Sequence, residues 1–231
     1  MRSVSRFYLS VFLTAVFCIC VFASTASASK GLNKQLISAT AYDGTVLEVQ
    51  SLITNGADVN AQDDDGVTAL MYAIMNGRTD LAKVLVGKGA NVNAKDNSGV
   101  TALMYAIKWD KMAILKLLMD KGADINVKTD DGMTPLIYAA ENSRAGVVKL
   151  LINKGADVNV KNPQRGSLKT FGFTPLMYAA MWDRADLVKL LLDNGANIAA
   201  RDYKGKTAEN IAVQYDCYDV LDILKKADAK Q

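Results

Sequence analysis

Residues 122–136 read GADINVKTDDGMTPL, and variants of this stretch recur along the chain. The triplet Gly-Ala-Asp or Gly-Ala-Asn recurs with spacings of 33, 33, 33 and 40 residues, beginning at Gly56, Gly89, Gly122, Gly155 and Gly195. A second series has spacings of 33, 33, 40 and 33 residues: Thr68, Thr101, Thr134, Thr174 and Thr207. Because both series contain one 40-residue step, they locate one seven-residue insertion between Asn159 and Gly172.

Each period predicts two short helices. Thr68 is a plausible N-cap for a helix that begins at residue 69 and is broken by Gly77. Leu81 and Leu85 mark the apolar face of a second helix, and Gly89 follows it where a left-handed residue is needed. Two such helices cannot bury their apolar faces alone, so we expect successive units to stack around one continuous core.

The repeats resemble the ankyrin repeat. Residues 132–136 and 172–176 are similar to its G-x-T-P-L motif, and residues 155–159 to its G-A-D-x-N motif. The resemblance covers about residues 32–227. It implies an all-α solenoid of stacked helix pairs with projecting β-hairpin loops and a concave face that binds protein partners.

Two departures from the family pattern stand out. The family has histidine after T-P-L, and this chain has other residues there: Met71, Met104, Ile137 and Met177. We therefore expect that the hydrogen bond by which this histidine customarily anchors the loop is absent. The family also favours glycine at the turn between the helices. Later units replace that glycine, and we expect the replacements to cap the second helix of their unit: Asp110, Ser143, Asp183 and Asp216.

The division of the chain follows from the repeats and from its first residues. We expect a signal peptide over residues 1–28 and a repeat domain over residues 29–231. The repeat domain divides into an N-terminal capping unit, four repeats and a C-terminal capping unit. Their ranges are 32–62, 63–95, 96–128, 129–161, 169–201 after an insertion at 162–168, and 202–231.

The first 28 residues have the pattern of an export signal. Arg2 and Arg6 precede an apolar run over residues 7–23, and the A-x-A sequence at 26–28 is a cleavage site. The mature protein would begin at Ser29 and be periplasmic or secreted. An uncleaved membrane anchor is the alternative. After cleavage Cys217 is the single remaining cysteine, so no internal disulfide is expected.

Composition argues against several function classes. The formal net charge is +3, and removing two arginines with the signal leaves 25 basic and 24 acidic residues, a net charge of +1. Such a balance predicts neither nucleic acid nor, beyond the signal peptide, a membrane as partner. The chain lacks histidine, the commonest general base and a common zinc ligand. We expect no catalytic site, no metal and no cofactor, and we interpret Cys217 as an inert, half-buried thiol.

The end of each first helix is expected to face the concave groove. The residue pairs at this place are Tyr42-Asp43, Met75-Asn76, Lys108-Trp109, Glu141-Asn142, Met181-Trp182 and Gln214-Tyr215. The chain's two tryptophans share one position in two units, and large aromatic residues often anchor interfaces. The predicted contacts with a partner protein of unknown identity are Trp109, Trp182, Tyr215, Tyr42, Met75, Lys108 and Met181. The alternative is that each indole packs flat on the neighbouring helix.

The loops supply a second set of predicted contacts. Residues after each loop glycine would line the projecting hairpins, where exposed apolar side chains suggest a partner: Val67, Val100, Met133, Phe173 and Lys206. The insertion region, residues 161–171, carries three basic residues and no acid. It is either neutral or a basic finger that contacts an acidic partner through Arg165, Lys169, Phe171 and Phe173. The recurring tyrosines suit interior packing: Tyr72, Tyr105, Tyr138 and Tyr178.

The sequence therefore predicts a monomeric protein-binding module and not an enzyme. A structural or envelope-stabilising spacer is a rival function, but it would not require exposed tryptophans. A small-ligand binder is a less favoured rival, because it would need a deep apolar pocket.

Overall fold

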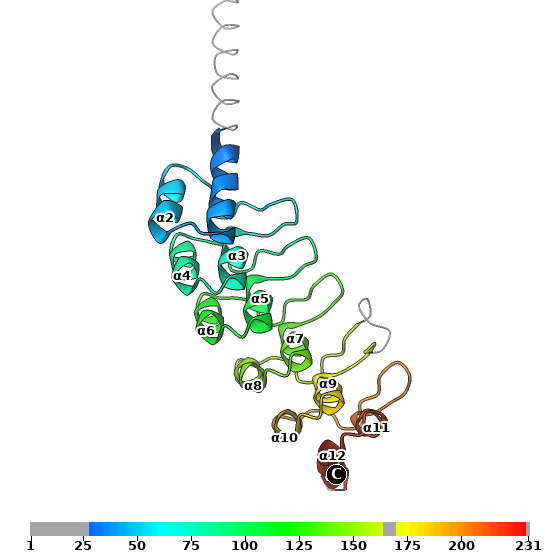
Figure 1. The fold of residues 1–231 in the computed structure, drawn as a ribbon. Helices are drawn as coiled ribbons and strands as arrows, with labels where there is room; N and C mark the ends of the chain where they lie inside the picture. Colours follow the sequence, from blue (N-terminus) through cyan, green and yellow to red (C-terminus); the bar gives the residue numbers. More distant parts are fainter. Residues whose placement is uncertain (1–27, 164–169, 230–231) are drawn as a thin grey trace, which may run out of the picture.

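The computed structural model describes residues 28–163 and 170–229 and has only helices and loops in these ranges (Figure 1). Residues 28–41 are helical. The helices that follow are α2 (Val46–Thr54), α3 (Ala69–Met75), α4 (Thr79–Gly87), α5 (Ala102–Lys108), α6 (Met112–Asp120), α7 (Pro135–Glu141), α8 (Ala145–Asn153), α9 (Pro175–Met181), α10 (Ala185–Asp193), α11 (Ala208–Gln214) and α12 (Tyr218–Asp228). None of the helices within the described ranges is long and apolar enough to cross a membrane.

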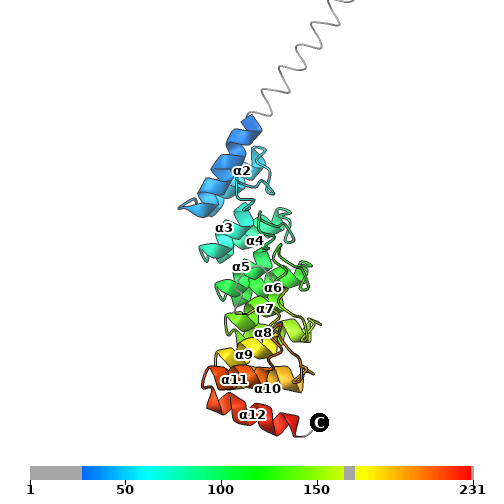
Figure 2. The same cartoon turned by 90° about the vertical axis from the view of Figure 1, so that its right-hand side faces the viewer.

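The helices form two parallel rows along an elongated stack. Figure 1 shows the helix of residues 28–41, α3, α5, α7, α9 and α11 in an inner row, with α2, α4, α6, α8, α10 and α12 in an outer row. Figure 2 shows the length of the stack from another side. Loops project as hairpins on the side of the inner row that faces away from the outer row (Figure 1). Two of the hairpins are closed by single antiparallel bridges, between residues 62 and 68 and between residues 95 and 101. This arrangement confirms the predicted solenoid of helix pairs.

The core runs continuously between the two rows. Leu70 and Ile74 on inner helix α3 and Leu81 and Leu85 on outer helix α4 are each at most 1% exposed. Equivalent residues in later units belong to the same buried cluster. Burying a leucine or isoleucine side chain contributes about 1.5–3 kcal/mol. The stack is therefore stabilised by contacts that each unit makes with its neighbours.

Threonine caps explain where the inner helices begin. The Thr68 hydroxyl oxygen accepts a hydrogen bond from the backbone N–H of Met71 at 3.3 Å, as predicted. Thr134, Thr174 and Thr207 make the same contact in their units. The buried Thr101 hydroxyl is the exception, because it has no hydrogen-bond partner among the described residues. Pro135 and Pro175 occupy first-turn positions, where proline does not remove an intrahelical hydrogen bond.

The prediction that the turn residues cap the second helices is wrong. The N-caps are the next residues along the chain, Lys111, Arg144, Arg184 and Cys217, and none makes a side-chain capping bond within the described structure. Asp110, Ser143, Asp183 and Asp216 instead adopt left-handed backbone conformations, with φ between 51° and 57°. They follow the inner helix, where Gly77 has φ 68°. Their role is to reverse the chain after the inner helix, which is the task of the glycine they replace.

We expect Ser143→Gly to stabilise the protein by about 0.5–1 kcal/mol, because glycine relieves the left-handed strain but loses more chain entropy on folding. Ser143 is the best site because Asp110 also pairs with Arg144. Urea denaturation should show the increase, and Ser143→Ala should not, since alanine keeps the strained backbone. Equal stability of the glycine and alanine variants would contradict this account.

The hairpins form a third, hydrogen-bonded layer. The backbone N–H of Asn97 donates to the carbonyl oxygen of Asp65 at 3.0 Å, and that of Asp130 donates to Ser98 at 3.0 Å. Asn162 makes the same backbone hydrogen bonds across its hairpin that Asp63 makes across the first one. The Gly172 N–H, for example, donates to the Asn162 carbonyl oxygen at 2.9 Å. Asn162 therefore belongs to the standard hairpin, and the extra residues follow it.

Candidate functional site

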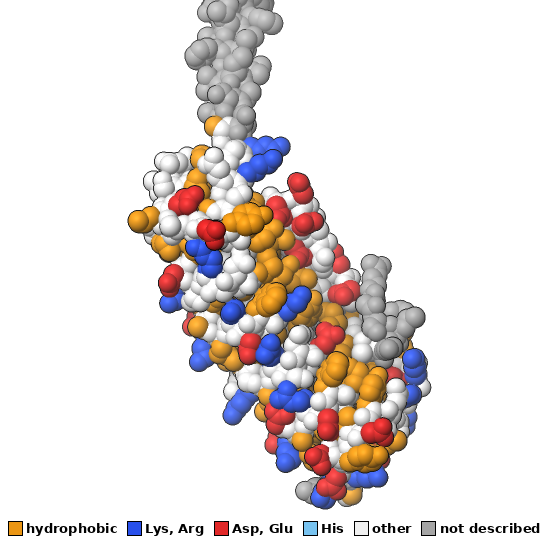
Figure 3. Space-filling view, in the orientation of Figure 1, with side chains coloured by type: hydrophobic (Ala, Val, Ile, Leu, Met, Phe, Trp, Pro, Cys, Tyr) orange, Lys and Arg blue, Asp and Glu red, His pale blue; other side chains and the backbone are white. Residues whose placement is uncertain are grey.

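The inner face is the surface formed by the inner helices and the hairpins. Figure 3 shows a band of hydrophobic side chains along this face, with acidic side chains on the hairpins of the N-terminal half. The exposed large hydrophobic residues at the ends of the inner helices are Tyr42, Trp109, Trp182 and Tyr215. Their position follows from the sequence period, because each lies at or next to the turn that ends an inner helix.

The two tryptophans are the C-caps of α5 and α9 and are 48% and 53% exposed, respectively. About half of each side chain therefore packs on the protein, and the other half faces solvent. Lys108 is exposed, and its Nζ lies 5.9 Å from the centre of the Trp109 ring. Tyr42 and Tyr215 are 75% and 42% exposed.

The remaining predicted helix-end residues, Met75 and Met181, are half-buried and pack against the core. They contribute less open surface than the aromatic residues. Both precede the exposed C-cap position.

Asparagine occupies the tryptophan position in two other units. The Asn142 amide donates to the carbonyl oxygen of Tyr138 at 2.8 Å, and the Asn76 amide donates to that of Ala41 at 2.8 Å. At this position a small polar side chain can therefore donate hydrogen bonds to backbone carbonyl oxygens at the helix ends. Since the position does not require a large indole, the exposed halves of Trp109 and Trp182 remain free to contact another molecule.

Tyrosine hydroxyls anchor the hairpins to the inner helices. The Tyr72 hydroxyl donates to Asp63 Oδ2 at 2.7 Å, and the Tyr105 hydroxyl donates to Asp96 Oδ2 at 2.8 Å. The hydrogen bond to Asp63 and then burial raise the pKa of Tyr72 to about 12. The hydrogen bond from tyrosine to aspartate thus joins loop and helix, in place of the histidine hydrogen bond whose absence the sequence predicted.

The prediction that the residues after the loop glycines contact a partner is wrong for three of them, because their apolar side chains are buried. Val67, Met133 and Phe173 are 7%, 7% and 3% exposed. Each turns inward beneath its hairpin, and Phe173 packs edge-on against Tyr178 with ring centres 5.4 Å apart. They are core residues, because the hairpin itself covers them. Val100 and Lys206 are intermediate in exposure.

The insertion region is only partly placed. Phe171 stacks on Tyr203 of the following hairpin, with ring centres 3.6 Å apart, so it stabilises the hairpin row. Arg165 and Lys169 lie outside the described residues. The idea that they form a basic finger stays a prediction.

The inner face contains a pocket of about 370 Å³ between α5, α7, α9 and the hairpins that precede α7 and α9. Its lining residues are Lys108, Asp131, Met133, Tyr138, Glu141, Asn142, Asn162, Thr170 and Tyr178. Sequence reasoning missed this pocket, because Tyr138 and Tyr178 looked like packing residues. Glu141 is an exposed residue, and partial desolvation followed by the nearby Asp131 carboxylate raises its pKa.

A smaller pocket of about 200 Å³ lies farther along the inner face and has the opposite charge. Its lining residues are Phe173, Asp202, Lys204, Lys206, Ile211, Gln214 and Tyr215. The Asp202 carboxylate accepts hydrogen bonds from the backbone of Lys204 and Lys206, so it is engaged within its own hairpin. The inner face therefore changes from acidic to basic along the stack.

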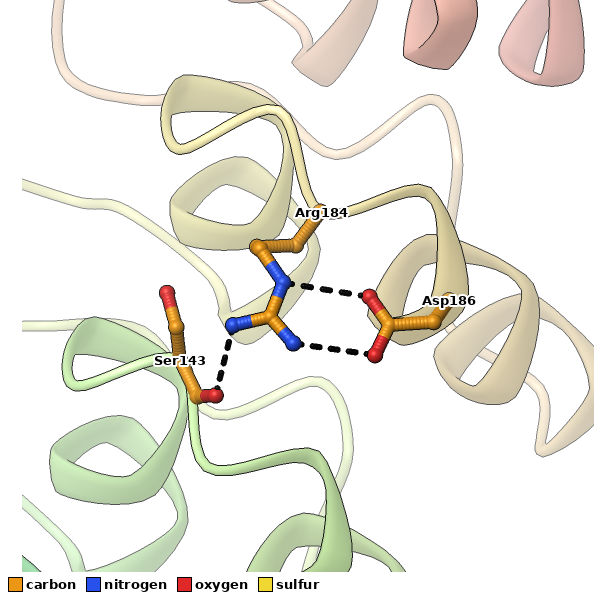
Figure 4. Close-up of polar contacts among 3 residues, drawn as sticks. All are labelled: Ser143, Arg184 and Asp186. Carbon is orange, nitrogen blue, oxygen red and sulfur yellow. Dashed lines mark hydrogen bonds and ion pairs between the residues drawn. The ribbon is translucent and has the colours of Figure 1, made fainter.

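Arginines tie together successive turns that join the inner helices to the outer helices. Arg184 donates to the Ser143 carbonyl oxygen at 2.8 Å and forms a two-pronged contact with the Asp186 carboxylate at 2.9 and 3.2 Å (Figure 4). The hydrogen bond from Arg184 lowers the pKa of Asp186. Arg144 likewise contacts Asp110 of the preceding turn at 3.1 Å. These contacts are structural, because each arginine binds the neighbouring unit.

The described residues contain no group of histidine, cysteine, aspartate or glutamate side chains suited to hold a metal ion. Cys217 is 4% exposed, and burial raises the pKa of its thiol. The thiol is therefore buried, where the sequence predicted it to be half-buried, and the raised pKa makes it a poor nucleophile.

Comparison with known families agrees with this geometry. The sequence matches the family described as "Ankyrin repeats (3 copies)" over residues 36–129 and 161–231, and the single "Ankyrin repeat" over residues 131–163. No curated protein gives a significant match. Stacked helix pairs, projecting hairpins and an exposed inner face are the features of a typically non-catalytic module for protein–protein interaction. The chain therefore belongs to the ankyrin-repeat family.

Proposed function

We propose that this chain is an exported scaffold whose inner face binds one partner protein. The observation that carries the proposal is the pair of half-exposed tryptophans at equivalent C-cap positions of α5 and α9. Asparagine fills the same position in two other units, so helix capping does not account for the indoles. Tryptophan is enriched among the residues that dominate binding energy at interfaces.

Affinity capture from extracts of the native cells tests this proposal. We expect Trp109→Ala and Trp182→Ala each to weaken retention of a bound protein by about 30-fold, corresponding to about 2 kcal/mol. Tyr218→Ala is the matched control, because Tyr218 is a 71% exposed aromatic residue on outer helix α12.

Circular dichroism should show that all three variants remain folded. A partner retained equally by the wild type and both tryptophan variants would contradict binding at the inner face.

The proposal includes export, which is supported by the basic residues, apolar run and A-x-A sequence of residues 1–28. We expect N-terminal sequencing of the protein from its native cells to begin at Ser29. Recovery of a chain that still begins at Met1 would contradict cleavage. Capture experiments should accordingly use extracts from the compartment in which the processed chain is found.

A further inference from the structure

The acidic pocket lies between the two units that present tryptophan. Lys108 precedes Trp109 on α5, Glu141 and Asn142 end α7, and Trp182 follows α9. The pocket is lined by residues of all three units. A segment of a bound protein that touches both indoles would therefore pass over it.

A change in one hairpin explains why the pocket is present here. The first two hairpins carry Asp63 and Asp96, whose carboxylates bind the hydroxyls of Tyr72 and Tyr105. The third hairpin has Thr129 at this position. Thr129 donates its hydroxyl hydrogen to Asp131 and accepts from the backbone N–H of Met133. The aspartate anchor for Tyr138 is thus missing, and the Tyr138 side chain lines a hollow.

The described part of the pocket lining has an excess of negative charge. Among the described lining residues, Asp131 and Glu141 are the two carboxylates and Lys108 is the single basic residue. Among the described residues, neither carboxylate forms an ion pair, and the Lys108 ammonium lies over Trp109 instead. Burial, followed by the charges of Asp131 and Glu141, raises the pKa of Tyr138. The local field therefore favours a cation.

We propose that this pocket receives an arginine side chain of the partner protein, while flanking parts of the partner contact Trp109 and Trp182. This inference rests on the proposed function. A guanidinium is planar, carries five N–H donors and stacks on aromatic rings. It can donate to the Asp131 and Glu141 carboxylates while its face lies against the ring of Tyr138. The basic second pocket, with Lys204 and Lys206, disfavours the same side chain.

Nuclear magnetic resonance with N-acetylarginine amide tests the pocket without a known partner. We expect this probe to shift the signals of Asp131, Tyr138 and Glu141 in the folded protein, and its neutral isostere N-acetylcitrulline amide to bind at least about tenfold more weakly. A bound cation favours ionised Glu141, so its carboxyl titration should move to lower pH. Equal binding of the two probes, or no shift of the pocket signals, would overturn the proposal.

Two substitutions separate the pocket from general electrostatics. Glu141→Gln should weaken binding of the arginine probe about tenfold, because it removes one carboxylate from the lining. Asp130→Asn removes the same charge from an exposed hairpin residue that does not line the pocket, and it should change binding less than twofold. An equal effect of the two variants would refute a specific site.

The same variants distinguish failure of this inference from failure of the proposed function. A captured partner that is lost with Trp109→Ala but bound fully by Glu141→Gln would overturn the arginine pocket and leave the protein-binding function standing. A pocket that binds the arginine probe, in a protein whose tryptophan variants retain every captured protein, would instead overturn the proposed function. Loss of the partner with Glu141→Gln but not with Asp130→Asn supports both.

Discussion

Replacing Gly99 with alanine is expected to destabilise the protein by about 3 kcal/mol, combining left-handed strain with a steric clash. Gly99 has φ 76°, a conformation that side chains rarely adopt. A Cβ atom there would lie 2.7 Å from the Asp130 backbone nitrogen and 2.9 Å from the Thr129 Cα. Since these are backbone atoms, the next hairpin would have to move. That movement would also break the hydrogen bond from Asp130 N–H to the Ser98 carbonyl oxygen.

Gly205 provides a matched control for the Gly99 substitution. Its φ is 75°, but a Cβ atom there would meet nothing within 4 Å, because its hairpin is the last described one. We expect Gly205→Ala to cost only about 1 kcal/mol, which is the backbone strain alone. Urea unfolding of both variants measures the difference. Equal losses would mean that hairpin stacking contributes no steric constraint.

The periodic residues made the fold predictable. Each threonine, glycine and apolar position recurs in several units, so the same local structure is predicted several times over. Packing between similar neighbouring units then produces the stack. The same regularity placed the two tryptophans at the end of an inner helix, and the structure has them there, half-exposed. That they contact a partner stays a prediction.

Predictions failed where a side chain's role depends on the neighbouring unit. Phe173 reads as an exposed loop residue, yet its own hairpin folds over it, and it packs on Tyr178. Asp183 reads as a helix cap because it precedes a helix by two residues, but the chain reversal demands a left-handed residue there first. The acidic pocket combines residues from three units and includes the change to Thr129 in the third hairpin, so the pattern of one unit does not reveal it.

Arg78 is expected to hold the N-terminal capping unit on the stack. Its guanidinium donates to the carbonyl oxygens of Ala39 at 3.2 Å, Tyr42 at 2.9 Å and Gly44. These carbonyls lie at the end of the helix formed by residues 28–41, where orphan acceptors and the helix dipole both favour a cation. The contact joins the first unit to the start of α4, for which Arg78 is the N-cap.

Arg78→Ala should therefore destabilise docking of the first unit by about 3 kcal/mol, since hydrogen bonds to charged groups contribute about 1.5–3 kcal/mol each and Arg78 is only partly buried. Hydrogen exchange should speed up first in residues 28–54, while α7 to α10 keep their protection, because a solenoid can open from one end.

Arg201→Ala is the control. It also removes one arginine, but among the described residues the Arg201 guanidinium donates its hydrogen bond to the Gly205 carbonyl oxygen within its own hairpin, so exchange in the first unit should not change. If Arg78→Ala speeds exchange no more than Arg201→Ala does, the backbone carbonyls of the first unit do not need the guanidinium, and apolar packing of residues such as Leu36 and Leu52 alone retains that unit.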